Sequence, residues 1–201
     1  MDLNYSLKNI FPSPIHSIDI GDFDQFKNKI IEEIYQERDR DSIGRKVSNY
    51  GGWQSQESNV NECKLETLKE IIIESLAQFN QNLFLDNVSM VVFGWANING
   101  PGNFNVKHCH PRSNLSGVFW IKVPKNSGNL VFSSPHLFSR YQELDLYRPE
   151  FYLNFNSHWK YPKLPEEGQI LIFSSDLEHE VEENMSDEDR ISYSFNIRLS
   201  L

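Results

Sequence analysis

The hydrophobic positions follow a helical period in the first half of the chain. Residues 22–37 and 64–84 each place apolar side chains on one stripe of a helix. Asp22 followed by Gln25 resembles a capping box, which predicts that the first helix begins there. The stripes consist of Phe23, Phe26, Ile30 and Ile34 in the first helix, and of Leu65, Leu68, Ile72, Leu76, Phe79 and Leu83 in the second.

Beyond residue 84 the pattern changes to short β-branched and aromatic runs. They fall at 88–98, 104–110, 115–123, 130–132, 152–159, 170–174, 177–182 and 190–199, with turn sequences such as NGPGN and KNSGN between some of them. Such a series is typical of a β-sandwich or barrel, and no alternating βαβ pattern is visible. We therefore expect one mainly β domain over 1–201, in which 1–84 supplies two supporting helices and 85–201 the β core.

Composition narrows the class of protein. The 201 residues are 39% hydrophobic and 13% aromatic, which suffices for a core without disulfides. The net charge of −9, with no basic cluster, disfavours nucleic-acid binding. Cys63 and Cys109 are too few and too far apart for a disulfide scaffold or a zinc finger, and we expect Cys109 to be a small buried residue. No leader or membrane span is visible, so we expect a cytoplasmic protein that does not bind membranes.

The segment KHCHP at 107–111 carries the first candidate chemistry. On an extended strand His108 and His110 point to the same face, where two imidazoles can share a metal ion. The alternative is a pair of surface histidines near a turn. In LEHEV, His179 shares its face with apolar residues and should point inward, while Glu178 and Glu180 turn away. Together the three histidines favour a metal site.

The last predicted strand has an unusual polar face. This face carries Arg190, Ser192, Ser194 and Asn196. The alternative is a face in water, but such a face usually carries mixed long charges. A guanidinium pairs a carboxylate through two hydrogen bonds, and a serine hydroxyl can add a third. This face could therefore anchor a small dicarboxylate, with Glu188 or Asp189 orienting Arg190.

These motifs resemble a known family. The HxH pair, the later histidine and an arginine 11 residues after it (190 − 179 = 11) resemble the 2-oxoglutarate and Fe(II)-dependent oxygenases. Four segments are similar to those of a bacterial and phage family of such enzymes, which is related to prolyl hydroxylases. They are IFPSPI, SNYGGWQS, NVKHCHPRSNLSGVFWIKVP and DEDRISYSFNI. The match spans nearly the whole chain. It implies a double-stranded β-helix, the jelly-roll or cupin-like fold, with flanking helices.

The resemblance also implies roles for individual residues. His108 and His179 would bind Fe(II), and Arg190 would hold the distal carboxylate of 2-oxoglutarate, assisted by Ser192 or Ser194. Trp120 stands where prolyl hydroxylases usually place a tyrosine that touches this cosubstrate, and Asn97 is expected to point inward near it. The implied reaction is hydroxylation of a C–H bond in a peptide or protein side chain or a small molecule.

The chain departs from the family pattern at His110. The usual iron site of two histidines and one carboxylate has an acid there. We expect three histidine ligands, and the alternative is a pair, His108 and His179, completed by water or substrate. In the 48–55 loop, Trp53, Gln54 and Ser55 are candidate substrate contacts, unless the loop packs Trp53 on the barrel.

Two further functions remain open at this point. A three-histidine metal enzyme could work without 2-oxoglutarate, and a non-catalytic binding module could have kept the barrel. The first alternative needs no interior arginine on the last strand, so Arg190 discriminates against it. The second is compatible with a site that lacks the acidic ligand, and anaerobic addition of Fe(II) and 2-oxoglutarate discriminates against it.

Overall fold

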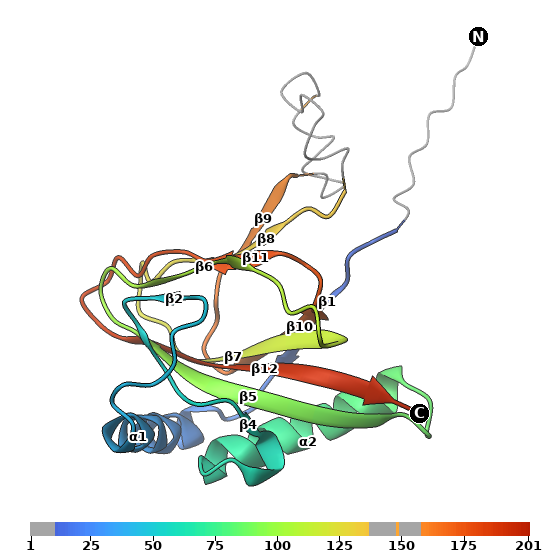
Figure 1. Cartoon of the computed structure of the whole chain (residues 1–201), viewed down its shortest axis with the longest axis horizontal. Coiled ribbons are helices and arrows are strands. Elements are labelled where there is room, and N and C mark those ends of the chain that lie inside the picture. Colours follow the sequence, from blue (N-terminus) through green and yellow to red (C-terminus); the bar gives the residue numbers. More distant parts are fainter. Residues whose placement is uncertain (1–10, 137–147, 149–157) are drawn as a thin grey trace.

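The computed structural model describes residues 11–136, 148 and 158–201 (Figure 1). Its described strands form two antiparallel sheets that face each other, flanked by two helices. This is the mainly β, jelly-roll arrangement that the sequence predicts. Of the strand predicted at 152–159, residues 152–157 lie outside the described residues.

The larger sheet lies between the two helices and the smaller sheet in Figure 1. Its strands run in the order β1-β10-β7-β12-β5-β3, and β4 pairs with β5 beside β3. Neighbours in this sheet are distant in sequence, so the chain crosses repeatedly to the other sheet. The strands are β1 Ile15–Asp19, β3 Trp53–Gln54, β4 Ser58–Asn59, β5 Ser89–Asn99, β7 Leu115–Lys122, β10 Gln169–Ser174 and β12 Arg190–Ser200.

The smaller sheet lies across the first, in the order β2-β6-β11-β8-β9. It consists of β2 Asn49–Tyr50, β6 Phe104–His108, β8 Leu130–Ser133, β9 Lys160–Lys163 and β11 His179–Val181. The longer runs were predicted from the sequence. The strands β1 to β4 and β9 were not predicted.

Both helices cover the outer face of the larger sheet, as expected (Figure 1). They are α1 Asp24–Arg40 and α2 Glu66–Leu83, with a 3-10 turn η1 at Val60–Glu62. The predicted stripes are buried except for Phe26 and Leu83, whose side chains are 38% and 47% exposed. The capping box does not form, because α1 begins after Phe23 without a side-chain cap. Among the described residues, none of the helices is long and apolar enough to cross a bilayer.

Strand β12 divides the interior into an apolar and a polar side. Its residues Ile191, Tyr193 and Phe195 pack into the core between the larger sheet and the helices. The alternate residues face the space between the two sheets, where Arg190 and Ser192 are buried. The alternation predicted for this strand is therefore confirmed, and its polar face points into the molecule rather than into water.

Candidate metal and cosubstrate site

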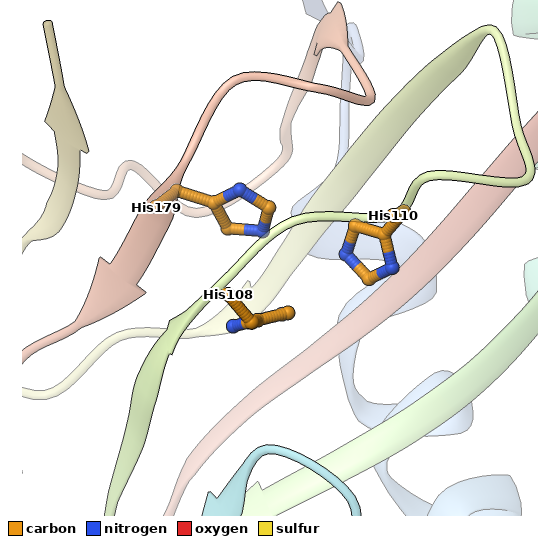
Figure 2. A group of neighbouring side chains, drawn as sticks. All are labelled: His108, His110 and His179. Carbon is orange, nitrogen blue, oxygen red and sulfur yellow. The ribbon is translucent and has the colours of Figure 1, made fainter. Parts of the chain in front are cut away.

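The three predicted histidines meet between the sheets (Figure 2). Antiparallel pairing of β6 with β11 sets His108 opposite His179. The ring centroid of His108 lies 4.5 Å from that of His179 and 4.9 Å from that of His110. Each ring offers one nitrogen within 4.8 Å of the others, so the group can hold a single metal ion.

A bulge in β6 aims His108 at this centre. His108 pairs with His179 and Asn105 pairs with Val181, so three steps along β6 match two along β11. The extra residue lets Asn105 and His108 both line the interior, although they are three apart. Bulges re-aim side chains in this way beside functional sites. The period-two pattern of the sequence contains no sign of it.

The chain leaves the strand before His110. The predicted extended segment 104–110 ends at His108, and the His110 N–H then donates to the carbonyl of Ser175 at 2.7 Å. Cys109 is exposed, so the expectation that it is buried is wrong. The reason is its place beyond the end of β6, where no neighbouring strand covers it.

Two of the rings are fixed by backbone carbonyls. The Nδ1 atom of His108 lies 2.7 Å from the Val106 carbonyl, and that of His179 lies 2.9 Å from the Leu177 carbonyl. A carbonyl only accepts, so each Nδ1 carries the hydrogen and each Nε2 keeps its lone pair. This is the tautomer that a metal ligand needs, and such support is typical of metal-binding histidines.

Burial keeps the rings neutral. It lowers the pKa of His179 to about 3 and that of His110 to about 4, and it also lowers the pKa of His108. The neighbouring imidazoles lower the pKa of His179 and His110 further, because two cations so close repel each other. At neutral pH all three rings are therefore uncharged, which is the state that metal binding requires.

One cavity contains the histidines and the predicted cosubstrate residues. It encloses about 530 Å³, part of it open to solvent, and its lining includes His108, His110, His179 and Arg190. Ser192, Ser194, Trp120 and Asn97 line it as well. Residues from both sheets thus converge as the sequence predicts. Among the described residues that line this cavity, none is acidic.

Arg190 lies in this cavity as a buried cation, and no carboxylate of the described residues pairs with it. Its side chain is 1% exposed, and Nη1 donates to the carbonyls of Ser127 and Glu182. Within residues 11–136, 148 and 158–201, the atoms Nε and Nη2 have no hydrogen-bond partner. Burial lowers the pKa of Arg190 to about 10, so it stays charged at neutral pH.

The acids expected to orient Arg190 are occupied elsewhere. Asp189 accepts a hydrogen bond from the Tyr35 hydroxyl at 2.7 Å, and Glu188 pairs with Lys122 at 2.8 Å. That expectation is therefore wrong. Because both carboxylates lie outside the cavity lining, the guanidinium fork is left for a ligand.

Comparison with known proteins agrees with this site. The family model described as "Putative 2OG-Fe(II) oxygenase" matches residues 94–196, a little over half of the chain. The chain belongs to this family. Its members are oxygenases that use Fe(II) and 2-oxoglutarate. No curated protein matches the sequence.

Solved structures show the same fold at low identity. A Pseudomonas putida prolyl-4-hydroxylase is 16% identical with a TM-score of 0.62, over 92% of each chain. A Trichoplax adhaerens prolyl hydroxylase, in complex with a hypoxia inducible factor peptide fragment, is 12% identical with a TM-score of 0.59, over 92% of this chain and 83% of that one. A non-heme alpha ketoglutarate dependent carbocyclase from nogalamycin biosynthesis is 11% identical with a TM-score of 0.60, over 92% and 79%.

Other unpartnered atoms of the oxygenase fit a bound dicarboxylate. Buried Trp120 has an indole Nε1–H with no acceptor in the part of the chain that the structure describes. In the cavity a carboxylate could accept from it and from Arg190. Asn97 donates from Nδ2 to Ser194 Oγ at 3.0 Å, while its Oδ1 has no partner in that same part of the chain. Neutral imidazoles near an unpaired guanidinium form a donor set suited to Fe(II) and 2-oxoglutarate.

The 48–55 loop of the oxygenase packs against the body of the fold. Trp53 Nε1 donates to the Asp41 carbonyl at 2.8 Å, and its ring packs on the main core. Gln54 is buried, and Ser55 exchanges two 2.9 Å hydrogen bonds with Ala96. These three side chains do not line the cavity. The packing alternative therefore describes Trp53, and substrate contact by this loop stays a prediction.

Sequence reasoning missed several residues that line the cavity. They are Trp95, Asn99, Asn105 and Ser48. Asn99 donates to Asn105 Oδ1 at 3.1 Å, and Asn105 to Ser48 Oγ at 3.4 Å. Asn97 and Asn99 are two apart on one strand, and this spacing could have indicated Asn99. For Asn105 and Ser48 only the bulge and the pairing of β2 with β6 explain the placement.

Proposed function

We propose that this oxygenase hydroxylates a C–H bond of a peptide or protein side chain, or of a small molecule. Fe(II) is held by His108, His110 and His179, and the distal carboxylate of 2-oxoglutarate by Arg190. Ser192, Ser194, Trp120 and Asn97 complete the cosubstrate pocket.

The single observation that carries the proposal is the state of Arg190. Burying a cation without a counter-ion costs several kcal/mol, so an unpaired guanidinium in a cavity indicates an anionic ligand there. A metal enzyme that works without 2-oxoglutarate, or a binding module for neutral ligands, would not require a buried, unpaired guanidinium and the free energy that it costs. The three histidines in the same cavity connect the anion with a metal ion.

The side chains have distinct tasks in this reaction. When bound, Fe(II) and 2-oxoglutarate would together activate O₂ for the oxidation of a substrate C–H bond. The neutral imidazoles hold the metal ion. Arg190 neutralises the distal carboxylate of 2-oxoglutarate and fixes the orientation of this cosubstrate in the pocket. Leu130, Phe173 and Val118 form an apolar part of the pocket lining.

Support for a peptide substrate comes from the fold comparison. The Trichoplax adhaerens prolyl hydroxylase was solved with a peptide fragment, and its chain shares this fold over 92% of the present one. The cavity here is also partly open to solvent, so an extended chain could present a side chain to it.

A direct test uses synthetic peptides that differ in one central side chain. Each is incubated with the protein, Fe(II), 2-oxoglutarate and ¹⁸O₂, and both succinate and peptide mass are measured. We expect one peptide class to gain a single ¹⁸O atom in step with succinate. Succinate formation without oxygen gain in any peptide would contradict the peptide substrate. Absence of succinate throughout would contradict the use of 2-oxoglutarate.

A further inference from the structure

We propose that Asn196 is a positioning residue that determines whether His110 binds the metal ion. The inference rests on the three-histidine site proposed above and concerns the ligand that departs from the family pattern. Asn196 does not line the cavity, so it acts through His110 rather than on substrate or cosubstrate.

His110 is supported differently from the other two histidines. The Nδ1 atoms of His108 and His179 face carbonyls of the backbone, which can only accept a hydrogen bond. The Nδ1 atom of His110 faces the Nδ2 atom of the Asn196 carboxamide at 3.5 Å. A carboxamide has a donor end and an acceptor end, so this contact does not fix one tautomer by itself.

The orientation of the Asn196 amide sets the chemistry of His110. With Nδ2 facing the ring, Nδ1 accepts and the neutral imidazole carries its hydrogen on Nε2, which then cannot bind a metal. After a half-turn of the amide, Oδ1 accepts from Nδ1–H, and Nε2 offers its lone pair. The first state leaves two histidine ligands and the second gives three.

A hydroxyl chain allows both orientations. Ser116 Oγ donates to Asn196 Oδ1 at 2.8 Å and lies 2.7 Å from Ser175 Oγ. Hydroxyl hydrogens rotate, so after the half-turn Ser116 can accept from Nδ2 and donate to Ser175 instead. The number of hydrogen bonds stays the same, so the amide turns at little cost and a bound metal ion can select the orientation with three ligands.

Ser175, Ser116 and Asn196 also hold His110 in place beyond the end of its strand. Because β6 ends at His108, no ladder holds His110, and its N–H is bound by the Ser175 carbonyl instead. Asn196 and Ser116 are direct partners in the pairing of β12 with β7. The ring of this ligand therefore contacts β12 of the larger sheet, and its backbone is held by Ser175, which directly follows β10.

The test is a double-mutant cycle on metal affinity, with Co(II) as the probe under anaerobic conditions. Its visible spectrum reports both the affinity and the number of ligands. We expect Asn196→Leu, which cannot hydrogen-bond, to weaken Co(II) binding by about 10- to 100-fold. Asn196→Asp, which only accepts, should retain or strengthen it. In the His110→Ala background, Asn196→Leu should cause no further loss.

The outcomes separate this inference from the proposed function. An equal loss caused by Asn196→Leu with and without His110 means that Asn196 supports only the fold, and overturns its positioning role. Wild-type affinity in Asn196→Leu, with a loss in His110→Ala, overturns the role of Asn196 alone. Wild-type affinity in His110→Ala overturns the three-histidine set and the inference that rests on it.

Discussion

At the scale of residues, the site consists of side chains whose hydrogen-bonding capacity the protein leaves incomplete. Although all three are buried, Arg190 and Trp120 keep donors, and Asn97 keeps an acceptor, that no described residue partners. Buried polar atoms are nearly always paired in folded proteins. Their concentration in a cavity with three neutral histidines therefore indicates that a ligand completes them.

Replacing Arg190 by methionine tests whether a ligand completes the hydrogen bonds of its guanidinium. We expect Arg190→Met to raise the 2-oxoglutarate concentration needed for half-saturation by at least about thirty-fold, since losing one partner of a buried charge pair costs about 2 kcal/mol or more. Metal content should hardly change. Equilibrium dialysis with labelled 2-oxoglutarate, alongside metal analysis, measures both.

Arg198→Met is the matched control, because Arg198 lies on the same strand but is exposed and stacks on Phe93 outside the cavity. It should bind 2-oxoglutarate as the wild type does. Parallel loss of metal and 2-oxoglutarate in Arg190→Met would show that Arg190 supports the fold instead of the cosubstrate.

At the scale of elements, close approach of a loop to the sheet shapes one side of the cavity. A Cβ added at Gly52 would lie 2.2 Å from Asn99 Oδ1 and 2.9 Å from the Ile98 carbonyl. Asn99 in turn holds Asn105 on the bulged strand β6. Gly52 is therefore needed for the close contact between this loop and strand β5.

Gly52→Ala should consequently destabilise the protein. We expect a loss of about 1–3 kcal/mol in the free energy of unfolding, because either the loop or Asn99 must move. Urea denaturation measures the change. Gly21→Ala is the control, since a Cβ there would meet nothing within 4 Å, and its midpoint should stay near that of the wild type. Equal midpoints for both variants would contradict the close packing of this loop.

Elements also show where sequence patterns stop being informative. The alternation in β12 placed Arg190 correctly, because one face of the strand packs on the core and the other does not. The exposed positions of Phe26 and Leu83 could not be foreseen, since a helical stripe does not reveal how far the sheet beneath extends. The bulge in β6 and the end of that strand before His110 depend on pairing with β11, which no local pattern records.

At the scale of the whole molecule, the fold brings together residues that are far apart in sequence. His108 comes from the smaller sheet through β6, His179 through β11, and Arg190 from β12 of the larger sheet (Figure 1). Residue types and spacing predicted this set, because the motifs resemble a family with a known arrangement. The wall of Trp95, Asn99 and Asn105 was not predicted, because it depends on how the two sheets face each other.

The central claim is that one cavity holds both Fe(II) and 2-oxoglutarate. The most direct measurement is the visible absorption spectrum under anaerobic conditions, as Fe(II) and then 2-oxoglutarate are added. We predict a weak charge-transfer band that needs both components, that is lost in Arg190→Met and that persists in Arg198→Met. A protein that binds Fe(II) yet gives no band at saturating 2-oxoglutarate would contradict the account.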